Sequence, residues 1–154
     1  MKKTLWFDMD GTIANFYGVE NWLQFLQNSD VTPYEIAKPL ISMQNLIDVL
    51  QLAKGNDWEI GIISWTSKTG TREFNKATKK AKTEWLKKYG LYSLLDEIHV
   101  VKYGTNKNSV CKKYCDYGIL LDDEQQNLDK WNIGDCIKAN NNLIENLFKA
   151  INKA

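Results

Sequence analysis

Short apolar runs alternate with segments of helical periodicity along most of this chain. The apolar runs are typical of buried strands, whereas the segments between them carry apolar residues at helical spacing. Strands that alternate with amphipathic helices form parallel sheets, because each helix provides the crossover that parallel strands require. We therefore predict the α/β class, with an open parallel sheet and helices on both faces. The predicted strands cover residues 5–7, 58–63, 98–101, 118–121 and 136–138, and the predicted helices cover residues 43–54, 72–89, 109–115, 124–130 and 143–151.

Polar residues follow several of these strands, at the point where each strand is expected to end. In open α/β sheets the ligand lies at the carboxyl ends of the strands, near the point where the strand order reverses. The sequence therefore predicts a site built from the polar residues at these ends. They are Asp8, Ser64, the segment 102–107 and the pair Asp122-Asp123.

One segment, residues 15–42, departs from the alternation. It contains several aromatic residues and both prolines of the chain, and it lies between the first predicted strand and the first long predicted helix. A chain of 154 residues suits one domain. We predict a single domain over residues 1–154, with residues 15–42 as a small helical cap insertion above the strand ends. The alternative, a pair of helices that only pack on the core, stays open.

The charge of the chain gives no sign of a nucleic-acid or membrane partner. The sequence carries 20 basic and 19 acidic residues, for a net charge of +1, and no apolar run approaches the roughly 20 residues of a membrane span. We expect no membrane association and no stable nucleic-acid binding. A lysine-rich segment is interpreted as a solvated face of the helix predicted over 72–89. Its members are Lys76, Lys79, Lys80, Lys82, Lys87 and Lys88.

The cysteines are interpreted as reduced packing residues. Cys111, Cys115 and Cys136 cannot all pair within one chain, and the single histidine, His99, completes no zinc site with them. Together with the absence of a signal-peptide core after Met1, this predicts a cytoplasmic protein.

Two acidic residues directly after the first strand carry the strongest chemical signal. Asp8 and Asp10 are two residues apart, and in an extended segment such side chains project the same way. Carboxylates this close repel each other unless a cation lies between them, and Mg²⁺ is the usual hard cation beside phosphate. Gly11 permits a tight turn after them. Considered alone, the pattern also fits a plain turn or a calcium loop.

A second acidic pair follows the fourth predicted strand. Asp122 and Asp123 come directly after the apolar run 118–121. Acids at the end of a buried strand need compensation for their lost hydration, although an ordinary solvated loop remains an alternative. Because both pairs fall at carboxyl ends of predicted strands, we expect them to meet at one cation.

These motifs resemble the signatures of the haloacid-dehalogenase superfamily of phosphatases, in the same order along the chain. The matching residues are Asp8-Met9-Asp10-Gly11-Thr12, Ser64 after a strand, a downstream lysine and Asp122-Asp123. The resemblance covers residues 4–123 and implies a Rossmann-like fold with a cap. Short stretches around Trp85, Gly104 and Leu120 are also similar to the 5'(3')-deoxyribonucleotidase branch of that superfamily.

The resemblance implies a role for each matching residue. Asp8 would be the nucleophile that forms an aspartyl phosphate, and Asp10 would be the general acid and base. Mg²⁺ would be held by Asp8, by the backbone carbonyl of Asp10 and by Asp123, with Asp122 behind them. Ser64, the neighbouring Trp65 and a lysine would bind the phosphate. Lys107 fits the lysine position better than Lys102, which remains the alternative.

The expected substrate is a small-molecule phosphate ester. A (deoxy)nucleoside monophosphate is one expectation, because Phe16, Tyr17 and Trp22 of the insertion could stack on a base. The alternative is that Trp22, with Phe25 and Leu26, forms the buried stripe of a helix. Sugar phosphates, phosphoproteins and nucleic-acid ends remain alternative substrates, and a non-catalytic regulatory module remains the alternative from another class.

Overall fold

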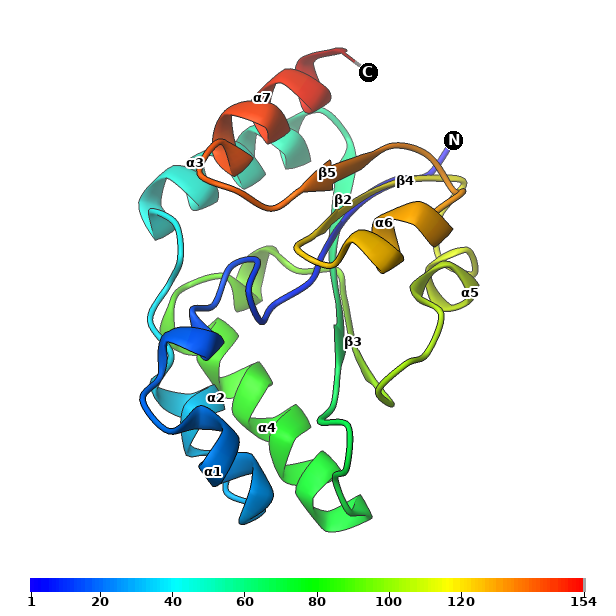
Figure 1. Ribbon diagram of the computed structural model, residues 1–154. Helices are drawn as coiled ribbons and strands as arrows, with labels where there is room; N and C mark the ends of the chain where they lie inside the picture. Colours follow the sequence, from blue (N-terminus) through cyan, green and yellow to red (C-terminus); the bar gives the residue numbers. More distant parts are fainter. Residues whose placement is uncertain (154) are drawn as a thin grey trace.

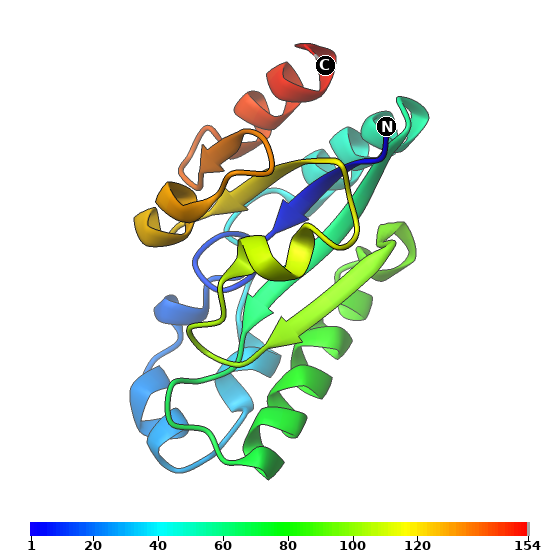
Figure 2. The ribbon, with the colours of Figure 1, turned by 90° about the vertical axis from the view of Figure 1, so that its right-hand side faces the viewer.

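The computed structural model describes residues 1–153 and contains an open sheet of five parallel strands in the order β3-β2-β1-β4-β5 (Figures 1 and 2). This confirms the predicted α/β class with an open parallel sheet. The strand order reverses at β1, which lies at the centre of the sheet between β2 and β4. The strands are β1 (Lys3–Phe7), β2 (Trp58–Trp65), β3 (Glu97–Val101), β4 (Tyr117–Asp122) and β5 (Cys136–Lys138).

The helices fall between the strands much as predicted. Side-chain caps fix the starts of the two longest ones, because Ser42 accepts a hydrogen bond from the backbone of Asn45 and Thr71 accepts one from the backbone of Phe74. In the part of the chain that the structure describes, the helices are η1 (Phe16–Gly18), α1 (Trp22–Gln27), α2 (Thr32–Ile36), α3 (Met43–Gly55), α4 (Arg72–Lys88), η2 (Tyr92–Leu94), α5 (Lys107–Cys111), α6 (Gln125–Lys130) and α7 (Leu143–Lys153). None of them is long and apolar enough to cross a membrane.

Many predicted bounds differ from those of the structure by one or two residues, and two of the differences matter for the site edge of the sheet. The helix predicted over 109–115 is α5, which begins at Lys107 because the side chain of Asn106 caps it by accepting from the backbone of Asn108. β2 continues beyond residue 63, since Ser64 and Trp65 still pair with β3. Ser64 and Lys107 therefore lie on a strand and a helix rather than in loops.

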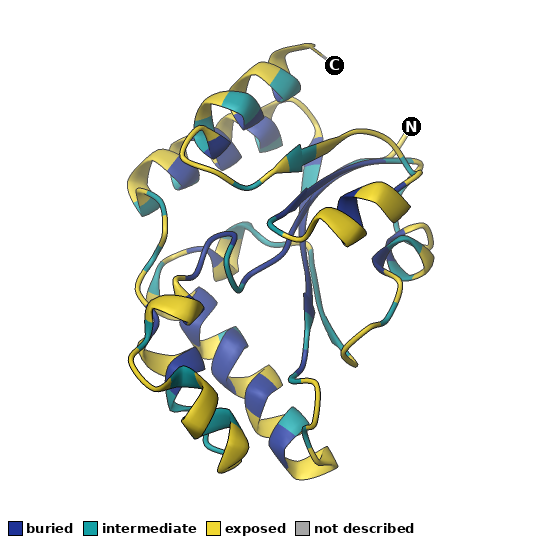
Figure 3. Cartoon of the chain, viewed as in Figure 1, coloured by how far each residue is buried: buried dark blue, intermediate teal, exposed yellow. Residues whose placement is uncertain are grey.

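Helices cover both faces of the sheet, and the alternation of β1 divides the core between them (Figure 3). Leu5 and Phe7 face a large apolar cluster that includes residues of α3, α4 and α7. Trp6 faces the other way, into a smaller cluster with residues of α5 and α6. β1 is thus buried on both sides, which holds the segment that follows it in a defined place.

The insertion 15–42 is closed at its base and leans on α4. Its two ends are joined by backbone hydrogen bonds, from Asn15 to the Lys38 carbonyl (2.7 Å) and from Leu40 to the Ile13 carbonyl (2.9 Å). Within it, Phe16 and Tyr34 form an apolar cluster with residues of α4. The insertion is therefore a short helical excursion that packs against one flank of the strand ends.

Gly61 permits the close approach of β2 to Trp6, and we expect Gly61→Ala to destabilise the fold. A Cβ at this position would overlap the ring of Trp6, whose side chain is fully buried. Overpacking of this kind costs about 1–3 kcal/mol. Urea unfolding followed by tryptophan fluorescence measures the change in the free energy of unfolding.

Gly55→Ala is the matched control for that substitution, because a Cβ at Gly55 meets nothing within 4 Å. We expect the control to leave the urea midpoint unchanged or slightly higher. Equal midpoints for the two variants would contradict the close approach of Trp6 and Gly61.

Candidate active site

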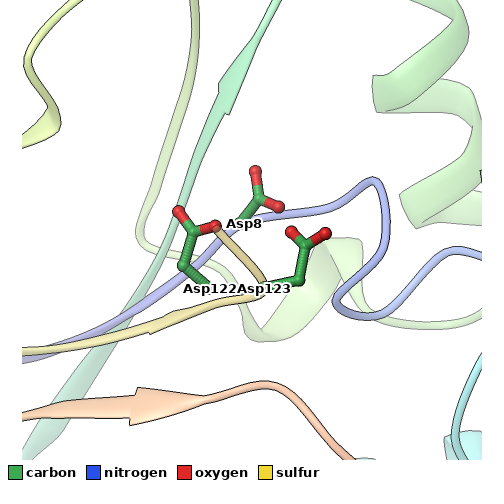
Figure 4. Close-up of side chains that lie close together, drawn as sticks. All are labelled: Asp8, Asp122 and Asp123. Atoms are coloured by element: carbon green, nitrogen blue, oxygen red, sulfur yellow. The ribbon is translucent and has the colours of Figure 1, made fainter. Parts of the chain in front are cut away.

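Three carboxylates converge at the carboxyl ends of β1 and β4. The two strands are neighbours with Phe7 opposite Leu121, so Asp8, which follows Phe7, lies beside the pair Asp122-Asp123. Each of the three residues offers an oxygen atom, and these atoms all lie within 4.8 Å of one another. Figure 4 shows the three side chains gathered at one point. Such a buried acidic cluster could bind a metal ion.

Burial and mutual repulsion raise the pKa values of two of these acids. The pKa of Asp123 is raised to about 8, chiefly by burial and then by the charge of Asp8. Burial also raises the pKa of Asp122, and the charge of Asp8 adds to the shift. A raised pKa means that ionising these groups destabilises the folded protein. A divalent cation among the three oxygens would reverse this effect, so the residues present fit a hard cation such as Mg²⁺.

The turn after β1 places a glycine and a threonine against the same acids. Gly11 has a φ of +82°, and a Cβ there would overlap the carboxylate of Asp123. The turn therefore requires a glycine for two reasons: its positive φ, as expected for a tight turn, and the space that the Asp123 carboxylate occupies. The Thr12 hydroxyl lies 3.1 Å from Oδ2 of Asp8 and 3.4 Å from Oδ1 of Asp123. Thr12 belongs to the sequence motif, but the pattern of the motif predicts no role for it.

Lys107 is the lysine that lies among the acids. Its Nζ is 2.9 Å from Oδ1 of Asp8 and 2.7 Å from Oδ2 of Asp122, and the side chain is almost fully buried. Burial by itself would lower the pKa of Lys107, but the two carboxylates outweigh that effect and the pKa is raised. Lys102, the other candidate, is exposed. The start of α5 at Lys107 is what brings this side chain into the site.

Asp122 is held from several sides and has little freedom left. Besides the Lys107 contact, its Oδ1 accepts from the backbone of Glu124 (2.9 Å) and its Oδ2 accepts from the side chain of Asn127 (3.0 Å). The expected place of Asp122 behind the metal ligands stays a prediction, because its carboxylate is also one of the three that could hold a metal ion. Asn127 was missed by sequence reasoning, because an asparagine on a short helix has no distinctive pattern.

Asp10 lies apart from the three clustered acids and contacts a different lysine. Its Oδ2 is 2.9 Å from Nζ of Lys82, which is also 2.7 Å from the hydroxyl of Ser64 and 2.7 Å from the carbonyl of Trp65. The pKa of Asp10 is raised by burial, although the Lys82 charge opposes the shift. Four acids were expected to converge at one cation. In the structure three of them converge, and Asp10 lies beside them in an ion pair with Lys82.

The interpretation of all six lysines of α4 as a solvated face is wrong for Lys82. That side chain is 1% exposed, whereas the other five lysines are exposed as expected. Lys82 lies four residues after Thr78 and three before Trp85, both of which are buried, and so it falls on the inward stripe of the helix. This spacing was a signal in the sequence, but it did not indicate which partner would compensate the charge.

Ser64 and Trp65, the other expected phosphate-binding residues, end β2 at the same edge of the sheet. Ser64 is almost fully buried, and its hydroxyl contacts Lys82. The indole N–H of Trp65 donates to the carbonyl of Thr105 (2.9 Å) and ties β2 to the loop before α5. Nζ of Lys107 lies 5.4 Å from the centre of the Trp65 ring. The indole therefore supports the loop that leads into α5 and presents its ring to the site.

A cavity of about 660 Å³ opens in front of these residues. Its lining combines polar groups at the strand ends with aromatic side chains from the insertion, from the end of β2 and from the loop after β3. The polar groups include Asp8, Asp10, Ser64, Lys107 and Asp123, and the aromatic side chains are Phe16, Tyr17, Trp22, Tyr34, Trp65 and Tyr103.

We expect Mg²⁺ to stabilise the folded protein, because it relieves the repulsion among the three acids. At a concentration about ten times the dissociation constant, the free energy of unfolding should rise by about 1.4 kcal/mol. For a chain of this length the melting temperature should then rise by about 3–6 °C. Asp123→Asn should lose most of this response, and the exposed Asp57→Asn should keep it. Thermal melts with and without Mg²⁺ measure the shift in melting temperature. Equal shifts in the two variants would contradict the binding of the cation at this site.

Neither the protein-family models nor the curated proteins that were searched give a match to the chain. What is established for this chain is therefore the α/β fold with its five-stranded parallel sheet, and the buried cluster of Asp8, Asp122 and Asp123 that could bind a metal.

Proposed function

We propose that this chain is a Mg²⁺-dependent phosphate-monoester hydrolase of the haloacid-dehalogenase type, with Asp8 as its nucleophile. The observation that carries the proposal is the meeting of Asp8 with Asp123 at adjacent strand ends, with Lys107 between Asp8 and Asp122. This arrangement offers a cation site, a carboxylate nucleophile and a fixed positive charge in one place. Phosphoryl transfer through a covalent intermediate needs these three things together.

In the first step an oxygen of Asp8 attacks phosphorus while the bond from phosphorus to the leaving oxygen breaks. Thr12 and Lys107 each contact one oxygen of the Asp8 carboxylate, which fixes its orientation. Asp10 gives its proton to the leaving oxygen, so that an alcohol departs and an aspartyl phosphate remains. The ammonium of Lys107 offsets charge on the transferring phosphoryl group.

In the second step water replaces Asp8 on phosphorus. Asp10, now ionised, takes a proton from that water, whose oxygen bonds to phosphorus as the bond to Asp8 breaks. Inorganic phosphate leaves, Asp8 regains its carboxylate, and Asp10 is protonated again. One side chain thus serves as acid and then as base, which requires the Asp10 carboxyl group itself to lie beside the nucleophile and to stay off the metal ion.

The cation site would be formed by the side chains of Asp8 and Asp123 and the backbone carbonyl of Asp10, with Asp122 behind them. When bound there, Mg²⁺ would neutralise charge on the phosphate oxygens. Asp122 holds Lys107 and is itself held by Asn127 and the backbone of Glu124, so it keeps the lysine in place.

For the substrate we propose a small phosphate ester whose leaving alcohol carries a flat aromatic base, as in a (deoxy)nucleoside monophosphate. The support is the composition of the cavity, whose lining combines acids and a lysine with six aromatic rings. Tyr17 is half exposed there and packs edge-on against Phe16 and Trp22, so ring surface remains for stacking. Phe16 is stacked on Tyr34, and these two rings serve the insertion's own packing.

Asp8→Asn should abolish turnover while the fold is retained. The amide cannot act as the nucleophile, and kcat/KM should fall on the order of 10⁴-fold or more. Hydrolysis of an aryl phosphate in the presence of Mg²⁺ provides the measurement, and circular dichroism checks the fold. The exposed Asp57→Asn is the matched control and should keep full activity. Near-normal turnover by Asp8→Asn would exclude the proposed nucleophile.

Tyr17→Ala should weaken binding of nucleotides selectively. Loss of a stacking ring costs about 1–3 kcal/mol, which corresponds to a rise in KM of roughly 5- to 150-fold for a nucleoside monophosphate. KM for a sugar phosphate should stay unchanged, because no ring is lost from that contact. Phe148→Ala removes a similarly exposed ring from α7, which has no part in this cavity, and should change neither KM. Equal wild-type rates on nucleotides and sugar phosphates would remove the nucleotide proposal and leave the phosphatase proposal standing.

A further inference from the structure

Lys82 is a buried charge that reaches the site from the middle of α4, far from the strand ends in sequence. It is 1% exposed, and an ammonium group carries three N–H donors. Three oxygens surround it: Oδ2 of Asp10 at 2.9 Å, the hydroxyl of Ser64 at 2.7 Å and the carbonyl of Trp65 at 2.7 Å. Each donor therefore has a partner, and the geometry of the contact is fully determined.

We propose that Lys82 is the positioning residue for Asp10: it holds that carboxylate at the strand end of β2 so that the proton is delivered to the leaving oxygen. The inference rests on the proposed phosphatase function and deepens it. It assigns to Lys82 a duty separate from that of Lys107, which contacts the nucleophile and Asp122. Lys82 contacts no group that reacts with phosphorus, and it acts through Asp10.

The carboxylate of Asp10 depends on this one contact for its place. It lies on the turn after β1, and within residues 1–153 its side chain forms a hydrogen bond to Lys82 and to no other residue. A carboxylate on a turn samples several rotamers unless a partner selects one of them. Proton transfer needs hydrogen-bond reach of the leaving oxygen, and a displacement of 1 Å in a catalytic group can lower a rate about 100-fold.

Lys82 is itself held by elements other than the turn that carries Asp10. It lies on the buried stripe of a 17-residue helix, between Thr78 and Trp85. The Trp85 indole donates to the carbonyl of Ala37 in the insertion (2.7 Å), and the ring of Tyr34 lies 5.0 Å from Nζ of Lys82. The same ammonium contacts two successive residues at the end of β2. Through Lys82, the position of Asp10 is therefore tied to the sheet, to α4 and to the insertion.

The test uses the dependence of the rate on the leaving group. An alkyl phosphate needs a proton on its leaving oxygen, whereas 2,4-dinitrophenyl phosphate releases a stable anion and needs almost none. The measured quantity is kcat/KM, because it covers the steps up to formation of the aspartyl phosphate. Lys82→Met, which keeps most of the length of the side chain and removes the donors, should lose about 100-fold on the alkyl ester and less than about 5-fold on the dinitrophenyl ester.

Two further variants separate positioning from a structural role. Asp10→Asn should show the same dependence on the leaving group, and the double variant should lose no more on the alkyl ester than Asp10→Asn alone. Lys80→Met, on the exposed face of the same helix, should behave as wild type on both esters. If Lys82→Met fails to fold by circular dichroism, Lys82→Arg takes its place and should show a smaller loss with the same dependence on the ester.

The outcomes distinguish this inference from the function on which it rests. A wild-type protein that hydrolyses neither ester with Mg²⁺ overturns the proposed phosphatase function itself. An active wild type whose Lys82 variant loses equally on both esters, with losses that add to those of Asp10→Asn, overturns the positioning role and leaves Lys82 as a structural residue. An active wild type with the selective and non-additive loss supports the assignment.

Discussion

The arrangement of this site depends on the repulsion among carboxylates at the end of β1 and β4. Asp8, Asp122 and Asp123 are close enough to share one cation, and burial strengthens their mutual repulsion because less water screens it. The fold opposes this repulsion with a lysine placed between Asp8 and Asp122. The raised pKa values of Asp122 and Asp123 indicate that Lys107 does not balance the charge alone. A bound cation completes the balance in the function that we propose.

Two buried lysines divide the acids into two groups. Lys107 comes from the first turn of α5 and serves the cluster of three, whereas Lys82 comes from α4 and serves Asp10. The separation suits phosphoryl transfer, because a metal ligand must stay ionised while an acid–base residue must change its protonation state. Because Lys82 and Lys107 come from different helices, Asp10 and the three clustered aspartates have different electrostatic surroundings.

The insertion links the site to its surroundings through α4. Its base is closed by backbone hydrogen bonds near Asn15 and Lys38, and Trp85 of α4 donates to the carbonyl of Ala37 within it. This segment packs on a helix of the domain and also contributes aromatic residues to the lining of the cavity, whereas its role as a cap stays a prediction. The same helix carries Lys82, so packing of the insertion and placement of Asp10 share one support.

The sequence alone determined the strands and the acids that follow them, because both depend on local patterns. A short apolar run such as 5–7 predicts a buried strand, and the carboxyl ends of parallel strands lie at one edge, so Asp8 and the pair Asp122-Asp123 could be expected together. Only the tertiary structure decided which lysines are buried at the site. A lysine on a helix is normally solvated, and Lys82 is buried only because α4 turns that stripe toward the end of β2. Likewise, the choice between Lys102 and Lys107 depended on the start of α5, which the cap at Asn106 sets. The burial of a charge depends on partners distant in sequence, and local periodicity does not reveal which partners the fold will bring.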